Sequence, residues 1–162
     1  MIKTIKMIFL VILFFSMSTL SALAIEKGGN VPNIFGKTLN GKLFLLYSAK
    51  KTPRLITFFS IICKPCKKEL PEMAKLEKKY PKVAFVSVHA DDYSNKKVKT
   101  FVDKLSDAPE TIVCSSKAVK REYGFRGFPY SVMVDENGVV IDQFIGYNHA
   151  NMQRLEKLLA TY

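Results

Sequence analysis

The sequence predicts a single α/β domain in which helices cover both faces of a mixed β-sheet. The almost wholly apolar run Arg54–Ser60 is typical of a strand that is buried on both faces of a sheet. Strand-like and helix-like segments alternate after it, and strand–helix–strand crossovers require parallel neighbours. Near the end, two strand-like runs meet at Asn137-Gly138, a pair that favours a tight hairpin and so adds antiparallel strands.

Local patterns place the elements of the first half in chain order. Leu39-Asn40-Gly41-Lys42 has the composition of a turn, and Leu43–Tyr47 that of a short strand. After the buried run at 54–60, residues 67–80 carry apolar side chains at helical spacing. Residues 82–89 alternate in the manner of a strand.

The second half continues the alternation and closes with a helix. Asn148 is placed to cap this last helix, whose apolar positions would face inward. The remaining expected elements are helices at 95–105 and 117–123 and strands at 111–114, 130–134 and 139–144.

Composition and charge narrow the classes of function. The 162 residues are 48% hydrophobic and 24% charged, which is ordinary for a globular protein and argues against disorder or a coiled coil. Three cysteines are too few for a disulfide scaffold. The net charge of +11 comes mainly from scattered lysines, without the Arg-rich, aromatic-interleaved stripe of a nucleic-acid reader. We therefore interpret the charge as a basic, solvated surface and expect no nucleic-acid partner.

Residues 1–24 have the three-part plan of a secretory signal peptide. Lys3 and Lys6 precede the apolar run Met7–Phe15, and Ala22-Leu23-Ala24 is a small-x-small cleavage signal. The run is short for a transmembrane helix, so we expect cleavage and a domain of residues 25–162, although an uncleaved inner-membrane anchor is the alternative. Either arrangement places the domain in the periplasm or elsewhere outside the cytoplasm, where disulfides persist.

The chemistry is expected at Cys63-Lys64-Pro65-Cys66, where the buried strand runs into a helix start. Backbone N–H groups at a helix start favour a thiolate on the first cysteine, and the Lys64 charge adds to that effect. We expect Cys63 to be the exposed, attacking sulfur and Cys66 to face inward and resolve the mixed disulfide. A structural disulfide or half of a zinc site are the other uses of such a pair, but a zinc site normally needs a second ligand pair at similar spacing.

The stretch from Phe58 to Pro71, with its Cys-x-x-Cys-Lys-Lys-Glu-Leu-Pro block, closely resembles the active-site segment of thioredoxin-fold proteins of the TlpA/ResA type. The segment 123–129, ending in Gly127-Phe128-Pro129, is similar to the part of that family that leads to its cis-proline. The resemblance covers about Val31 to Leu159. It implies a thioredoxin-like fold with an N-terminal β extension and a central helix-containing insertion.

The resemblance also implies roles for single residues. Pro129 matches the cis-proline beside the disulfide, and Phe128 would shape the groove in which an extended substrate segment pairs with the backbone. Glu69 matches an acidic residue that assists proton transfer or tunes the thiols in some members. The alternative for Glu69 is a solvated helical residue that pairs with a lysine. The expected catalytic residues are Cys63, Cys66 and Glu69, and the expected substrate-binding residues are Lys64, Pro65, Phe128, Pro129 and Tyr130.

Three positions depart from the family pattern. Ile62 stands where a tryptophan is usual before the first cysteine, so shielding of the disulfide by an indole is not expected. Tyr130 replaces the frequent threonine after the cis-proline, and its bulk would alter substrate choice. Lys64 replaces a glutamate or apolar residue, which would stabilise the thiolate and raise the reduction potential modestly.

The expected function is that of an extracytoplasmic protein-disulfide oxidoreductase without a cofactor, which exchanges disulfides with protein substrates and electrons with a redox partner protein. The resemblance suggests a reductant role in cytochrome c maturation. The alternative is a copper or zinc metallochaperone that uses the same cysteines with a histidine. Cys114 is expected to pack as a small hydrophobe, and His89 to lie at a loop edge.

Overall fold

The computed structural model describes residues 25–47 and 51–162. The expected signal segment, residues 1–24, lies outside the described residues. Within the described part of the chain, no helix is long and apolar enough to cross a membrane.

Seven strands form one mixed sheet in the order β2-β1-β5-β4-β3-β6-β7. β3, β4 and β5 run parallel, as their helical crossovers require, and the other neighbouring pairs are antiparallel. The elements in chain order are β1 (Phe35–Thr38), β2 (Leu43–Leu45), β3 (Arg54–Phe59), α2 (Cys66–Lys79), β4 (Ala84–His89), α3 (Asn95–Val102), β5 (Ile112–Ser115), α4 (Ala118–Glu122), β6 (Tyr130–Val134), β7 (Val140–Ile145) and α5 (His149–Leu159). The expected α/β class, with its mixed sheet, is confirmed.

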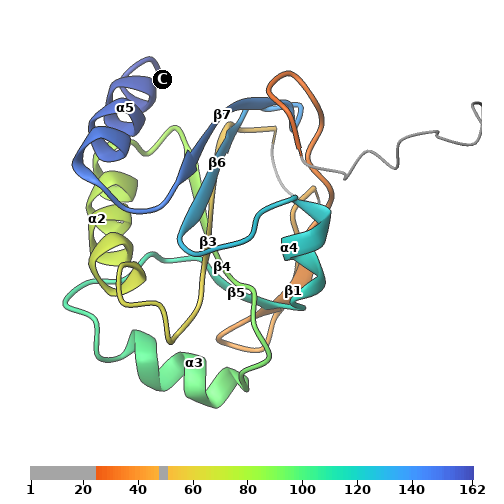
Figure 1. The fold of residues 1–162 in the computed structure, drawn as a ribbon, viewed down its shortest axis with the longest axis vertical. Helices are drawn as coiled ribbons and strands as arrows, with labels where there is room; N and C mark the ends of the chain where they lie inside the picture. The colour runs from red at the N-terminus through yellow and green to blue at the C-terminus, as the bar shows by residue number, and fades with distance from the viewer. Residues whose placement is uncertain (1–24, 48–50) are drawn as a thin grey trace, which may run out of the picture.

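Helices cover both faces of the sheet, with α2 and α5 on one side and α4 on the other (Figure 1). The pleat of β3 distributes its side chains between these layers. Leu55 packs in a cluster with α2 and α5, and Ile56 and Phe58 pack on the α4 side. Phe59, at the end of the strand, joins a third cluster with α2 and α3. All six residues of β3 are buried, as expected for a strand between two others.

The elements agree with the sequence-based boundaries to within about three residues, and one strand was not anticipated. β1 is short and contains Gly36, so its sequence lacks the alternation of apolar and polar residues from which a strand is predicted. It forms because it pairs with both β2 and β5. A Cβ at Gly36 would lie 2.5 Å from the carbonyl oxygen of Cys114, so the glycine permits this close pairing. The β1–β2 hairpin precedes the buried strand β3, and α3 lies between β4 and β5 in the chain.

Candidate active site

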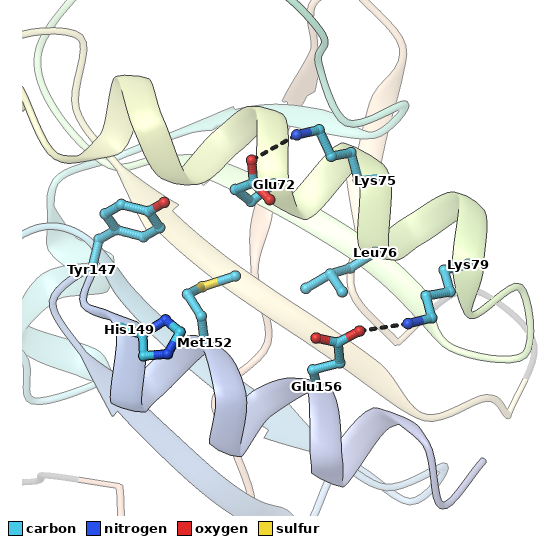
Figure 2. Close-up of a pocket in the computed structure, with 8 residues that line it drawn as sticks. All are labelled: Glu72, Lys75, Leu76, Lys79, Tyr147, His149, Met152 and Glu156. Carbon is cyan, nitrogen blue, oxygen red and sulfur yellow. Dashed lines mark hydrogen bonds and ion pairs between the residues drawn. The ribbon is translucent and has the colours of Figure 1, made fainter.

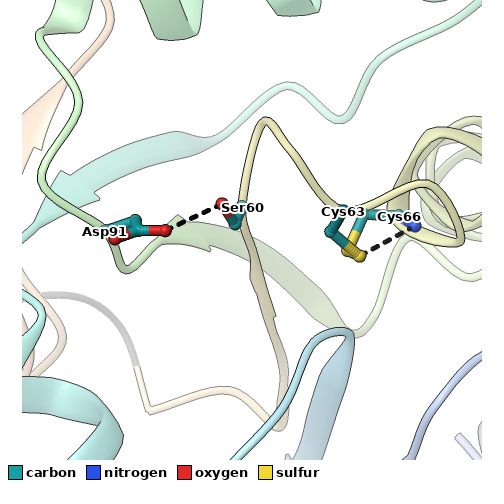
Figure 3. The surroundings of a disulfide bond; sticks show 4 residues. All are labelled: Ser60, Cys63, Cys66 and Asp91. Carbon is teal, nitrogen blue, oxygen red and sulfur yellow. Dashed lines mark hydrogen bonds between the residues drawn. A yellow bond between two sulfur atoms is a disulfide. The ribbon is translucent and has the colours of Figure 1, made fainter.

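The two cysteines lie where β3 ends and α2 begins, and they form a disulfide (Figure 3). The Cα atoms of Cys63 and Cys66 are 5.3 Å apart. The backbone N–H of Cys66 donates to the Cys63 Sγ over 3.2 Å. This N–H belongs to the first turn of α2, where backbone donors have no partner within the helix. The helix start therefore directs a hydrogen-bond donor at the first sulfur, which favours a thiolate there once the bridge opens.

The two sulfur-bearing residues differ in exposure. Cys66 is fully buried in the cluster with Phe59 and Leu70, whereas Cys63 is half-buried at its edge. A partner chain therefore approaches the disulfide from the Cys63 side. This asymmetry agrees with the expected division of roles between the two cysteines.

The side chains around Cys63 form an open rim. Lys64 and Pro65 are exposed, and the Pro65 carbonyl accepts hydrogen bonds from the N–H groups of Lys68 and Glu69 at the start of α2. Ile62 is 69% exposed and leaves an apolar side chain in solvent next to the first cysteine. Ile62, which stands where the family usually has a tryptophan, therefore leaves one approach to the sulfurs uncovered.

Ser60 and Asp91 hold the loop in place, and sequence reasoning did not assign them to the site. The Ser60 Oγ donates to the Asp91 Oδ2 over 2.9 Å, and the Ser60 carbonyl accepts the N–H of Cys63 (Figure 3). Ser60 is buried and follows β3, while Asp91 lies two residues after the neighbouring parallel strand β4. The available signal was topological, because polar residues after adjacent parallel strands meet at one edge of the sheet.

The bond between Phe128 and Pro129 is cis, as the resemblance implied. Pro129 is buried, and the half-buried Phe128 packs against the same apolar cluster as Cys63. The N–H and C=O of Phe128 make no hydrogen bond within the described residues, whereas the Pro129 carbonyl accepts the N–H of Gly146. The structure thus leaves the Phe128 backbone available for pairing with another chain.

The expectation that the Tyr130 side chain contacts the substrate is wrong for this structure. Tyr130 is 3% exposed, its ring stacks on Phe125, and its hydroxyl donates to the Gln143 Oε1 over 2.7 Å. Burial raises the pKa of this phenol to about 12. The first position of β6 turns its side chain toward the α4 side of the sheet, so the ring completes the core instead of the rim.

Glu69 lies inside the molecule and is not a solvated helical residue. It is 3% exposed, and its Oε2 has no hydrogen-bond partner among the described residues. Burial raises the pKa of this carboxyl to about 8, because the charged form is poorly solvated there. Glu69 is three residues after Cys66 on α2, a spacing that places two side chains on the same face of a helix. The site therefore holds a neutral carboxyl on the buried side of the disulfide at neutral pH.

The other sulfur and the expected loop histidine lie on the sheet. Cys114 is half-buried in β5, where burial raises the pKa of its thiol, in agreement with packing as a small hydrophobe. His89 is the last residue of β4, next to the loop that follows as expected, but its side chain is fully buried. The Phe59 ring lies edge-on to its imidazole, and burial lowers the pKa of that ring. Among the described residues, no three His, Cys, Asp or Glu side chains are grouped so as to hold a metal ion.

A separate cavity of about 580 Å³ lies between α2 and α5 (Figure 2). Its charged side chains are paired with one another, Lys75 with Glu72 and Lys79 with Glu156. Leu76 and Met152 supply its apolar wall. The cavity contains no cysteine, and its charges are already neutralised, so the redox chemistry belongs to the disulfide loop and not to this cavity.

The fold and the site together define a class of protein. A mixed sheet flanked by helices, a Cys-x-x-Cys pair at a helix start and a cis-proline are the features of thioredoxin-fold thiol–disulfide oxidoreductases. The chain matches the Redoxin family over residues 26–159, and it belongs to that family. Its activity is thiol–disulfide exchange through Cys63 and Cys66.

Similar proteins support this assignment. The chain is 34% identical to the thioredoxin-like protein YneN of Bacillus subtilis (strain 168), over 75% of this chain and 73% of that protein. It is 30% identical to the thiol-disulfide oxidoreductase ResA of Bacillus thuringiensis (strain Al Hakam), over 75% and 70% of the two chains. A crystal structure from Chlorobium tepidum, named as a thiol:disulfide interchange protein DsbE, superposes with a TM-score of 0.77 at 25% identity, covering 85% of this chain and 98% of that one.

The buried carboxyl of Glu69 predicts a pH-dependent stability. The unfolded chain loses this proton near its ordinary pKa of 4.5, while the folded chain keeps it up to about pH 8. Between these values the folded state binds more protons, so the free energy of unfolding falls as the pH rises, with a slope that approaches about 1.4 kcal/mol per pH unit. Urea denaturation of the oxidised protein from pH 5 to pH 8 measures this slope.

Substitution Glu69→Gln should remove that slope, because the amide does not titrate. The matched control is Glu72→Gln, three residues further along the same helix at a partly exposed, ion-paired residue. The control should keep the slope of the unchanged protein. Parallel pH profiles for the unchanged protein and Glu69→Gln would contradict the assignment of the slope to this carboxyl.

Proposed function

We propose that this protein is an extracytoplasmic oxidoreductase that keeps the thiols of other proteins reduced. Cys63 is the attacking residue and Cys66 the resolving residue. The observation that carries the proposal is the asymmetry of the pair: Cys63 is half-buried at the end of a loop, and Cys66 is fully buried behind it. A sulfur that attacks a protein disulfide must be reachable, whereas the second sulfur needs only to reach the first.

In the first step, the Cys63 thiolate attacks one sulfur of a substrate disulfide. The substrate S–S bond breaks, a Cys63–substrate mixed disulfide forms, and the other substrate sulfur leaves as a thiolate that takes up a proton from water. The N–H of Cys66, which points at the Cys63 Sγ, stabilises the negative charge before attack. The exposed ammonium group of Lys64 favours the same charge state.

In the second step, the Cys66 thiolate attacks the Cys63 sulfur. The mixed disulfide breaks, the Cys63–Cys66 disulfide forms, and the second substrate sulfur leaves as a thiolate that takes up a proton from water. Two electrons have then passed from the cysteine pair to the substrate. A reduced partner protein must restore the pair, because the chain itself supplies no further electrons.

Glu69 is the group that we propose for removing the Cys66 proton. A fully buried thiol cannot pass its proton directly to water, and Glu69 is buried on the same helix face. Only the ionised form of this carboxyl, a minority at neutral pH, can accept the proton. Because its pKa of about 8 is close to the ordinary thiol value of about 8.5, proton transfer from the Cys66 thiol to that form costs little free energy. A carboxyl with an ordinary pKa would be a much weaker acceptor.

Extended substrate segments are proposed to dock beside Phe128. The unpaired backbone N–H and C=O of this residue lie next to the disulfide-bearing cluster and offer one donor and one acceptor to a passing chain. Lys64 and Pro65 are exposed next to Cys63, and Pro129 is buried directly after Phe128. This arrangement suits a cysteine-containing polypeptide better than a small disulfide.

The location outside the cytoplasm rests on residues 1–24, whose charged, apolar and small-residue parts are those of an export signal. In that compartment thiols oxidise unless they are actively reduced, so proteins with essential free thiols there need a reductant. By resemblance to the TlpA/ResA type, apocytochrome c before haem attachment is the proposed example of a substrate.

Cleavage of the signal predicts a mature chain that begins at Ile25. Expression of the full chain in a bacterium that exports proteins, followed by cell fractionation and amino-terminal sequencing, tests this. A chain that retains Met1 in the membrane fraction would support the anchored form, and a chain that retains Met1 in the cytosol would contradict export.

The roles of the two cysteines predict different trapped species. Cys66→Ser should accumulate a mixed disulfide with a disulfide-bonded substrate protein, because nothing resolves it. Cys63→Ser should form none, since the remaining sulfur is buried. Mass spectrometry under non-reducing conditions measures both, and Cys114→Ser is the control that should behave like the unchanged protein. Equal adduct yields from Cys63→Ser and Cys66→Ser would contradict the assigned order.

The reductant role predicts a low reduction potential. Equilibration of the Cys63/Cys66 couple with glutathione mixtures, read by counting free thiols, should give a value near that of thioredoxin, about −270 mV. A potential near that of the strong oxidant DsbA, about −120 mV, would instead indicate a protein that forms disulfides.

A further inference from the structure

A groove of about 520 Å³ adjoins the disulfide loop on the side of α3. It is lined by the loop that carries the cysteines, by the first residues of α2 and by α3. Figure 1 shows α3 beside the turn that joins β3 to α2. Its apolar floor and its charged wall are formed by Ile61, Phe101, Lys67, Lys96, Lys97 and Lys104, which we call the lysine groove.

The four lysines of this groove carry unneutralised charge. All four are exposed, and none forms an ion pair within the described part of the chain. No carboxylate is among the residues that line the groove. The groove therefore combines positive charge with an apolar floor.

The nearby carboxylates are engaged elsewhere and do not balance this charge. Asp103 pairs with Lys99, on another part of α3, over 2.9 Å. Asp92 pairs with Lys117. Asp91 accepts the Ser60 hydroxyl. Four ammonium groups around one apolar floor repel each other unless an anionic group enters, so an acidic occupant is favoured.

We propose that the lysine groove binds an acidic segment of the protein substrate, with at least one apolar side chain between carboxylates, next to the cysteine that Cys63 attacks. This inference rests on the proposed function. The occupant is a polypeptide because Ile61 and Lys67 flank the Cys63–Cys66 loop, so a chain whose cysteine reaches Cys63 passes directly into the groove. The apolar side chain covers Ile61 and Phe101, and the carboxylates meet the lysines.

Complementary charge of this kind acts mainly on the rate of encounter and on the choice of partner. The effect should therefore appear in the second-order rate constant of exchange and should weaken with salt, since the screening length falls from about 10 Å at 0.1 M to about 3 Å at 1 M ionic strength. Chemistry at the sulfurs should be unaffected, because Lys97 and Lys104 lie on or after α3 and not on the cysteine loop.

The test uses the reduced protein and three oxidants. Two are synthetic peptides of identical sequence, each with one internal disulfide, that differ only in a flanking Glu-Leu-Glu or Lys-Leu-Lys. The third is the neutral bis(2-hydroxyethyl) disulfide, which reports on the cysteine chemistry alone. Acid-quenched samples separated by liquid chromatography give the rate constants at low salt and in 1 M NaCl.

The unchanged protein should reduce the Glu-flanked peptide about ten times faster than the Lys-flanked peptide at low salt, and the ratio should approach one in 1 M NaCl. The double variant Lys97→Glu/Lys104→Glu should abolish or invert the preference while reducing the neutral disulfide at the original rate. The matched control Lys82→Glu/Lys157→Glu changes the net charge equally at exposed residues outside the groove, and it should keep the preference.

Equal rates for the two peptides with the unchanged protein would overturn the lysine groove as a recognition site. The same would follow if the control variant lost the preference as fully as the groove variant, since net charge would then explain it. If the unchanged protein reduced neither the neutral disulfide nor the two peptides, the proposed exchange reaction itself would be overturned. This outcome differs from the two above, in which the neutral disulfide is still reduced.

Discussion

The burial of β3 between β4 and β6 is the constraint on which the site depends. All six of its residues are buried and its backbone is paired on both sides, so the point at which the strand ends is fixed in space. The loop that follows therefore starts from a fixed point, and the hydrogen bond between the Ser60 and Asp91 side chains holds it in place. Two sulfurs on a short loop can join reversibly only if their spacing survives reduction, and a rigid strand on one side with a helix on the other provides that.

The ionisable groups around the disulfide differ in burial, and their expected charge states differ accordingly. Cys63 and Lys64 lie toward solvent, where charge is tolerated and partners arrive. Cys66 and Glu69 lie inside, where the neutral forms are favoured. The helix start and the solvent thus favour a thiolate on the outer sulfur, and burial favours the protonated form of the inner sulfur. The same helix start serves both, because its first N–H donates to the Cys63 sulfur while the side chains of Cys66 and Glu69, in its first turn, are buried.

The folded chain distinguishes lysines that the net charge treats alike. Several on α2 and elsewhere are paired with carboxylates, as at Lys75 and Lys78. Those of the lysine groove are not paired within the described residues, and they surround an apolar floor beside the reactive loop. Basic charge that looks evenly scattered along the sequence therefore includes, in the folded chain, one cluster of unpaired lysines beside the disulfide.

The sequence by itself determined the α/β class, the hairpin at Asn137-Gly138, the cap at Asn148 and the place of the redox pair, because each depends on local periodicity or on residues close together in the chain. Only the tertiary structure decided which way Tyr130 faces, that Glu69 and His89 are buried, and that Ser60 meets Asp91. It also decided that β1, which has no pattern of its own, becomes a strand. These outcomes depend on what lies opposite a side chain or a backbone edge once distant segments have packed together, and that environment is not encoded in any short stretch of the chain.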